Sequence, residues 1–286
     1  MSDFLDTMAA HSRERVAAAQ REESETALRA RAEASAPAPG LAPAAAQGAP
    51  STFHLIAEVK LRSPAAGALA SGGQPLDALA ERALGYAAGG ASAISVLTEP
   101  SRFDGSLDHL AAVAAALAPT GIPAMRKDFL VAPYQLYEAR AAGAGGALLI
   151  LAMLDDATLG AMLELARELG LFVLLEAFDA AELDRAGAVL AHARHGEVLV
   201  GLNSRDLRTL EVEPGRFAAL ADRFPPGFAR IAESGVGDGA DAARIAAMGY
   251  TGALVGSALM QAEDAPALVQ QMLQHGRAAA TGHAAP

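Results

Sequence analysis

The sequence has no cysteine, and its 22 basic residues are outnumbered by 33 acidic ones. The absence of cysteine excludes a disulfide scaffold, a thiolate metal site and a cysteine nucleophile, and it is compatible with the reducing cytoplasm. The formal charge of −11 argues against binding to nucleic acid, because proteins that bind the phosphate backbone need a clustered positive surface. A small anionic ligand could still bind where a few cations gather.

Apolar runs long enough to span a membrane are missing as well. The run GALLILAML at 146–154 is shorter than the ~18 residues that a membrane span requires. The first 25 residues mix acidic and basic side chains and have no apolar stretch typical of a secretion signal. We therefore expect a cytoplasmic protein with no membrane association, and we interpret the apolar runs as buried strands.

Eight short apolar runs rich in strand-forming residues alternate with runs rich in alanine and leucine. They are FHLIAEVK at 53–60, SAISVLT at 92–98, PAMRKD at 123–128, GALLILA at 146–152, FVLLEA at 172–177, VLVGLNS at 198–204, ARIAES at 229–234 and GALVGS at 252–257. Strands that alternate with helices form parallel sheets. We therefore predict an α/β fold, a (β/α)8 TIM barrel with an extra N-terminal helical segment. A doubly wound open sheet is the alternative, because spacing along the chain does not reveal whether a sheet closes.

The chain divides into three predicted regions. Residues 1–50 hold an amphipathic helix, with apolar positions three and four residues apart between 3 and 32, and an Ala/Pro-rich linker. Residues 51–275 form the barrel, which is the catalytic domain, and residues 276–286 form a frayed C-terminal tail.

Polar residues follow the apolar runs at the ends where barrels and open α/β sheets bind their ligands. They are Glu58 and Lys60, Arg126 to Asp128, Glu176, Asn203 and Arg205, and Glu233. Glu58 and Lys60 share a face, because side chains alternate along a strand. Burial of a charge costs several kcal/mol unless it is paired or neutralised. Salt bridges that seal the barrel are one explanation, but Lys60, Lys127 and Glu176 together favour a catalytic site.

Small residues follow the last two runs, as Ser234-Gly235-Val236-Gly237 and Gly256-Ser257. In many barrels these loops and a helix N-terminus hold a phosphate, although glycines there can also simply make tight turns. Gly235-x-Gly237-x-x-Ala240 also fits the loose dinucleotide motif, but no acidic residue follows about 20 positions later. His192 and His195 have a spacing that can bind zinc, yet no third ligand lies nearby, and we interpret them as solvated.

Together these motifs resemble the indole-3-glycerol phosphate synthase family of tryptophan biosynthesis. The matching segments are IAEVKLRSPAAG at 56–67, AISVLTEPSRFDGS at 93–106, RKDFLVAPYQLYEARAAGAGGALLI at 126–150, LLEAFDAAEL at 174–183, GLNSRDLRTLEV at 201–212, IAESGV at 231–236 and ALVGSALMQAEDAPA at 253–267. Glu-x-Lys-x-x-Ser-Pro combined with Arg-Lys-Asp-Phe is the most specific part. Ala65 replaces the usual Ser or Thr, and Ser204 replaces a common second Asn, but neither position has an expected chemical role.

The resemblance implies a lyase that closes the ring of 1-(2-carboxyphenylamino)-1-deoxyribulose 5-phosphate, with loss of carbon dioxide and water and with no cofactor or metal. It implies that Lys127 acts as the acid and Glu176 as the base, assisted by Lys60, Glu58 and Asn203. Ser63, Pro64, Phe129 and Arg205 would hold the anthranilate part, and Ser234, Gly235, Gly256 and Ser257 the phosphate. Lys60 could meet either anion. We expect a monomer or a weak homo-oligomer.

Two other functions stay open from the sequence. The first is a different phosphate-binding barrel, such as an isomerase or an aldolase that uses Lys127 to form a Schiff base. The second is a catalytically silent barrel that binds a sugar phosphate or scaffolds a complex. In either case we expect Lys60, Lys127 and Arg205 to converge at one mouth and to create a local positive field within an acidic protein.

Overall fold

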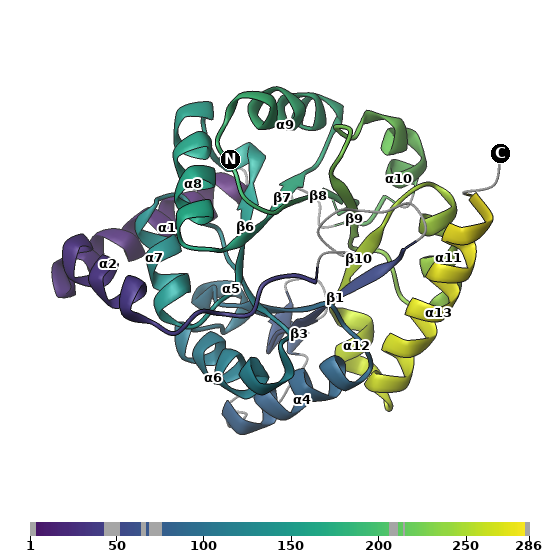
Figure 1. Cartoon of the computed structure of the whole chain (residues 1–286), viewed down its shortest axis with the longest axis horizontal. Coiled ribbons are helices and arrows are strands. Elements are labelled where there is room, and N and C mark those ends of the chain that lie inside the picture. The colour runs from purple at the N-terminus through teal and green to yellow at the C-terminus, as the bar shows by residue number, and fades with distance from the viewer. Residues whose placement is uncertain are drawn as a thin grey trace.

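The computed structural model describes residues 4–42, 52–63, 67–68, 76–205, 211–213 and 215–283, and eight parallel strands close into a barrel within them (Figure 1). The strands are β1 (His54–Val59), β4 (Ala93–Leu97), β5 (Ala124–Lys127), β6 (Gly146–Ile150), β7 (Phe172–Ala177), β8 (Val198–Asn203), β9 (Ala229–Glu233) and β10 (Gly252–Val255). Each lies inside the apolar run that predicted it. The pairing of β1 with both β4 and β10 closes the sheet, so the open-sheet alternative is wrong.

Helices surround the barrel and join successive strands (Figure 1). They are α4 (Leu76–Ala88), α5 (Pro100–Phe103), α6 (Leu107–Leu117), α7 (Tyr134–Ala141), α8 (Asp156–Glu168), α9 (Ala180–His192), α10 (Gly215–Leu220), α11 (Gly239–Ala247), α12 (Ser257–Gln261) and α13 (Ala265–His283). A small hairpin of β2 (Arg62–Ser63) and β3 (Gly67–Ala68) follows β1. Short 3-10 turns lie at Ala118–Thr120, Leu151–Met153 and Ala221–Arg223.

The barrel interior is filled with apolar side chains rather than open. One side of the strands packs against the outer helices, and the other side forms a separate buried cluster. The inward cluster contains Ile56, Ala93, Met125, Leu148, Ile150, Phe172, Leu174, Leu199, Ala229, Ile231 and Leu254. This cluster fills the barrel interior. The polar side chains at the C-terminal ends of the strands therefore lie over a buried apolar layer.

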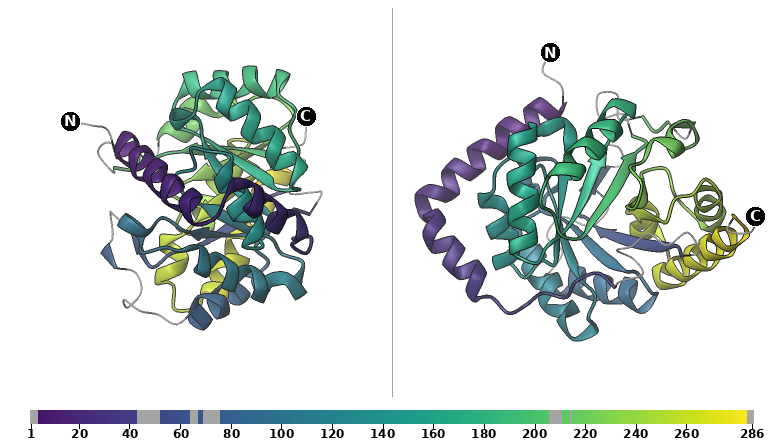
Figure 2. Two further views of the ribbon diagram at one scale, coloured as in Figure 1. Left: turned by 90° about the vertical axis from the view of Figure 1, so that its left-hand side faces the viewer. Right: turned by 45° about the horizontal axis from the view of Figure 1, so that its top comes forward.

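The N-terminal segment forms two helices, where the sequence predicted one over 3–32. They are α1 (Phe4–Glu22) and α2 (Glu25–Ala34). The break occurs because Ser24 adopts an extended backbone and its hydroxyl accepts a hydrogen bond from the Ala27 amide, which starts a new helix. Both helices lie against the outside of the barrel (Figure 2), where Val16, Leu28 and Ala32 form a buried cluster with two tyrosines of α7.

The C-terminal residues differ from the frayed tail predicted for 276–286. Helix α13 continues as far as His283, and Val269, Met272 and Ala280 on it are buried. Burial of these side chains against the barrel stabilises the helix beyond residue 275, which local sequence could not indicate. Among the described residues, no helix is both long and apolar enough to cross a membrane.

Candidate active site

A cavity with an empty volume of about 1070 Å³, its mouth included, opens at the C-terminal ends of the barrel strands. Eleven of the residues predicted from sequence line it: Glu58, Lys60, Lys127, Phe129, Glu176, Asn203, Arg205, Ser234, Gly235, Gly256 and Ser257. Two are not placed there. Only the backbone of Ser63 is described, in the β2 hairpin, and Pro64 lies outside the described residues.

Lys127 stands at the centre of the cavity between two carboxylates. Its Nζ lies 3.6 Å from Oε2 of Glu176 and 3.7 Å from Oε2 of Glu233. Burial alone would lower the pKa of Lys127, but Glu176, Glu233 and Glu58 outweigh it and raise that pKa above its ordinary value. The Lys127 amine is therefore an ammonium group at neutral pH, with a proton to donate.

Glu233 is a site residue that sequence analysis noted only as a polar strand end. Its side chain is 1% exposed, and burial raises the pKa of its carboxyl group, as does the neighbouring Glu176, against the opposing effect of Lys127. Both Glu233 oxygens and Oε2 of Glu176 accept no hydrogen bond from any described residue. Two of these acceptors have only the longer ion pairs with Lys127, and buried acceptors without hydrogen bonds in residues that line a cavity indicate a place for a polar ligand.

The local positive field that the sequence suggested at the mouth is offset by carboxylates in the same cavity. Lys60, Lys127 and Arg205 converge as predicted, but Glu58, Glu176 and Glu233 line the same cavity. Lys60 and Glu58 are joined directly, with Nζ and Oε1 2.5 Å apart. The positive charge is thus balanced at short range, because Lys60 pairs with Glu58 of the same segment and Lys127 faces Glu176 of β7 and Glu233 of β9 across the barrel.

Gly201 on β8 provides the space that Glu233 occupies. A Cβ atom at Gly201 would contact Oε1 of Glu233 and lie 3.1 Å from its carboxyl carbon. Gly201→Ala should therefore push the carboxyl group away from Lys127. We expect the free energy of unfolding to fall by about 1–3 kcal/mol, as in other overpacked cores, and kcat to fall about 10-fold through misplacement of these groups.

Thermal unfolding and steady-state kinetics would measure both effects. Gly160→Ala is the matched control, since a Cβ on that helical glycine of α8 meets nothing within 4 Å. Wild-type kcat in Gly201→Ala would contradict the space-making role.

Asn203 is fixed through both ends of its amide. Its Nδ2 donates to Oε1 of Glu176 over 2.9 Å, and its Oδ1 accepts from the Arg205 amide over 2.9 Å. The strand register places Asn203 beside Glu233. The side chain therefore orients the Glu176 carboxyl group and anchors the start of the loop that carries Arg205.

The predicted phosphate loops bring small residues and exposed backbone to one side of the cavity. Ser234 and Gly235 have consecutive positive φ angles of 66° and 71°, which is strained for a serine. Gly256 allows the chain to pass close to Lys60, because a Cβ there would lie 2.8 Å from Nζ. Asp238 already caps α11, whereas α12, which begins at Ser257, has no side-chain cap among the described residues.

The opposite side of the cavity is apolar and includes a residue of the N-terminal helix. The Phe129 ring lies 5.8 Å from that of Phe4 on α1 and 6.2 Å from that of Phe103, measured between centroids. Leu97 and Ile150 complete this wall. The sequence did not indicate that Phe4 belongs to the site, because Phe4 reaches the cavity through the docking of α1 on the barrel.

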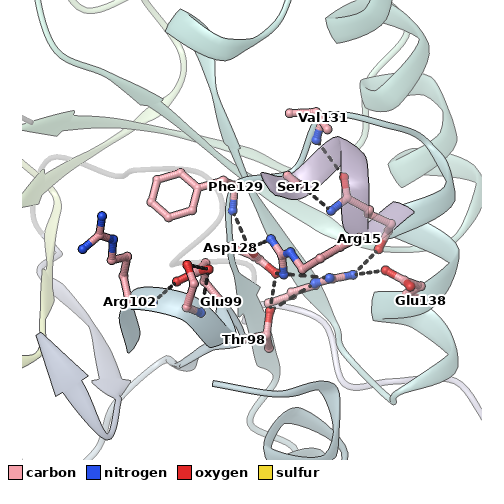
Figure 3. Close-up of polar contacts among 12 residues, drawn as sticks. Ser12, Arg15, Thr98, Glu99, Arg102, Asp128, Phe129, Val131 and Glu138 are labelled. Atoms are coloured by element: carbon pink, nitrogen blue, oxygen red, sulfur yellow. Dashed lines mark hydrogen bonds and ion pairs between the residues drawn. The ribbon is translucent and has the colours of Figure 1, made fainter. Parts of the chain in front are cut away.

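Asp128 directs its side chain away from the cavity centre into a buried ion network (Figure 3). Arg15 of α1 donates two hydrogen bonds to its carboxylate, at 2.9 and 2.7 Å, and Thr98 and Arg126 also donate. Burial would raise the pKa of Asp128, but Arg15 and Arg126 lower it below its ordinary value. Arg126 and Asp128 thus act as the sealing salt bridges considered earlier, while Lys127 between them faces the cavity.

Loss of Arg15 should loosen α1. Arg15→Met removes two charged hydrogen bonds but leaves Asp128 paired with Arg126, so we expect a loss of about 2–3 kcal/mol in the free energy of unfolding. Arg29→Met is the control, because Arg29 and Glu33 form an exposed pair that should contribute less than about 0.5 kcal/mol.

The pair of Arg15 and Asp128 makes the free energy of unfolding depend on pH. Because folding depresses the pKa of Asp128, its stabilisation is complete above about pH 4, the ordinary aspartate pKa, and is lost as pH falls through the depressed value. Denaturant unfolding should therefore show the gap between wild type and Arg15→Met narrowing at low pH. A gap that widens there would refute this account.

The two histidines considered for zinc lie apart from the cavity. His192 is the last residue of α9, and the His195 ring stacks 5.6 Å from that of Phe228. No three His, Asp or Glu side chains in the described part of the chain gather into a group that could hold a metal ion.

Comparison with known proteins gives a consistent result. A family model described as indole-3-glycerol phosphate synthase matches residues 5–272. The chain is 48% identical to the indole-3-glycerol phosphate synthase of Micrococcus luteus over 212 residues, 74% of each chain. It is 46% identical to that of Mycolicibacterium smegmatis over 222 residues, covering 78% of this chain and 77% of the relative.

Solved structures with little sequence identity share the fold alone. A 3-hexulose-6-phosphate synthase from Salmonella typhimurium matches with a TM-score of 0.60 at 13% identity, over 79% of this chain and 99% of the other. A thiamine phosphate pyrophosphorylase from Pyrococcus furiosus matches with a TM-score of 0.56 at 15% identity, over 80% and 97%.

Proposed function

The chain belongs to the indole-3-glycerol phosphate synthase family, and from this premise we propose how its residues divide the reaction among them. The enzyme is a carboxy-lyase of tryptophan biosynthesis. It converts 1-(2-carboxyphenylamino)-1-deoxyribulose 5-phosphate into indole-3-glycerol phosphate with loss of carbon dioxide and water. The observation that carries the proposal is a charged lysine held between two carboxylates at the centre of the cavity.

Lys127 is the general acid of ring closure. The ring carbon that bears the carboxylate attacks the ketose carbonyl carbon, and the carbonyl oxygen must gain a proton as its π bond breaks. The raised pKa of Lys127 keeps that proton available at neutral pH. Loss of carbon dioxide then returns an electron pair to the ring and restores its planarity.

Glu176 is the base of the final dehydration. The new hydroxyl group leaves and a proton is removed, which forms the double bond of the indole. Glu176 lines the cavity; Asn203 donates a hydrogen bond to one of its oxygens, while Oε2 accepts no hydrogen bond from the described residues and lies 3.6 Å from Nζ of Lys127. Glu58 and Lys60 stand close enough to the same centre to assist the departure of the hydroxyl group.

The two anionic ends of the substrate bind to different groups of residues in the cavity. Arg205 pairs with the anthranilate carboxylate through its guanidinium group, and Phe129 packs on the ring, with Ser63 and Pro64 as further contacts. Ser234, Gly235, Gly256 and Ser257 bind the phosphate through backbone and hydroxyl groups. The closeness of Gly256 to Lys60 favours the phosphate as the anion that Lys60 meets.

Turnover of synthetic substrate tests the proposal directly. The purified protein should produce the fluorescence of the indole product with no added cofactor or metal. Borohydride in the presence of substrate separates the Schiff-base alternative, because covalent trapping of Lys127 would refute the acid role. Tight binding of substrate without product would favour the catalytically silent barrel.

The protein acts on a small phosphorylated molecule, and we propose that it does so in the cytoplasm as a monomer or a weak homo-oligomer. The absence of cysteine is compatible with this reducing setting. Sedimentation velocity across a concentration series would reveal a stable oligomer if this is wrong.

A further inference from the structure

The residues directly after β8, Ser204 and Arg205, pair with Val212 and Glu213 farther along the chain. Ser204 is buried, and its carbonyl accepts from the amide of Glu213 over 2.8 Å. Arg205 and Val212 form an isolated antiparallel bridge next to this contact. The outgoing and returning chains are thus paired at the point where Asn203 ends the strand.

Arg216, in the first turn of α10, joins these two paired segments. Its Nη1 donates to the carbonyl of Asn203 over 3.0 Å, and its Nη2 donates to Oε2 of Glu213 over 2.9 Å. The Arg216 side chain is only 14% exposed. One planar fork therefore holds the last residue of β8 and the returning chain in a fixed relation.

We propose that Arg216 is a positioning residue that acts on the reaction through Asn203. The carbonyl that it holds belongs to the residue whose amide donates to Glu176. A shift of this peptide would move the Asn203 amide off Glu176 and release the Arg205 amide from Oδ1. The inference rests on the proposed role of Glu176 as the base of dehydration.

The structure gives Arg216 no direct part in the chemistry. The cavity is lined by Asn203 and Arg205, and Arg216 is not among its lining residues. Its guanidinium group donates one hydrogen bond to a backbone carbonyl and another to an exposed glutamate. A lysine or a glutamine at this position could form only part of this arrangement. Its effect must therefore pass through the position of the Asn203 peptide.

The test is a double-mutant cycle with steady-state kinetics. Arg216→Met should lower kcat about 10-fold, the size of effect given by loss of a charged hydrogen bond, with a change in KM of less than about 3-fold. In an Asn203→Ala background the same substitution should lower kcat no further, because the residue through which it acts is gone. Arg216→Lys should restore part of the loss.

Arg223→Met is the matched control, because Arg223 pairs with Asp184 at 3.6 Å and both side chains are more than half exposed. It should keep wild-type kcat. If Arg216→Met does not fold, Glu213→Gln removes the charge of one partner of the fork, and it should lower kcat in the wild-type background but lower it no further in the Asn203→Ala background.

Four outcomes separate the possibilities. Equal losses from Arg216→Met in the wild-type and Asn203→Ala backgrounds would overturn the positioning role, as would a rise in KM with unchanged kcat. Wild-type kinetics in Arg216→Met would also overturn it, while leaving the proposed function intact. Absence of product from the wild-type enzyme would instead refute the proposed function itself.

Discussion

Replacement of Lys127 by methionine is expected to lower kcat by about three orders of magnitude, within the range measured for loss of a general acid. The ketose oxygen would then have no ammonium group from which to gain its proton. Substrate binding should persist, because the residues proposed to hold the phosphate and the carboxylate are left unchanged by this substitution. Single-turnover fluorescence and equilibrium titration with product would measure the two effects separately.

Lys127→Arg distinguishes two possible contributions of Lys127 to catalysis, its positive charge and the proton that it donates. Arginine keeps a positive group between Glu176 and Glu233 but does not give up its proton in a protein. It should therefore fold as the wild type does and show a kcat nearly as low as that of Lys127→Met. Near-normal turnover by the arginine variant would mean that Lys127 contributes charge rather than a proton.

The second large effect is expected from Glu176→Gln. Glutamine keeps the shape of the side chain and an oxygen that can accept from Asn203, but it removes the base that takes up the final proton. The release of indole product should slow by about 100- to 1000-fold. Carbon dioxide should still be released early in a single turnover, because decarboxylation precedes the step that Glu176 catalyses.

The comparison of the two products decides the role. A burst of carbon dioxide ahead of indole fluorescence means that a decarboxylated, still hydrated intermediate accumulates. Equal slowing of both products would place Glu176 before decarboxylation and contradict the assignment. Glu182→Gln is the control, because Glu182 accepts from the Phe178 amide in the loop after β7 and does not line the cavity.

The strands and most of the cavity could be predicted because they leave local signals. A strand buried on both faces is a short apolar run, and the polar residue that ends it stands out against that background. Glu58 and Lys60 were placed together by the alternation of side chains along β1. The same alternation separates Lys127 from Arg126 and Asp128, although the sequence alone did not say which of them faces the ligand.

The parts that escaped prediction depend on contacts between distant segments. Arg15 and Asp128 are 113 positions apart in the sequence, and the residues around either one do not indicate that the two form a pair. Phe4 reaches the cavity because that pair, together with the packing of Met8 and Val16, holds α1 in place. The role of Glu233 was missed for a related reason, since its pKa and its contact with Lys127 depend on how β9 packs inside the closed barrel.

The closure of the barrel between β1 and β10 sets the order in which the enzyme can become active during its synthesis. His54 of β1 pairs with Gly252 of β10. β1, the first barrel strand to be synthesised, therefore gains its second neighbouring strand only when β10, the last one, has been synthesised. Gly256, which follows that last strand, lies against the Glu58 and Lys60 pair of the first. A nascent chain that ends before β10 therefore already contains the glutamates and lysines that line the cavity. Its β1 and β9 are not yet joined by β10, and it lacks Gly256 and Ser257 of the proposed phosphate site. Catalytic competence arrives late, after release of nearly the whole polypeptide, and not progressively as each strand emerges.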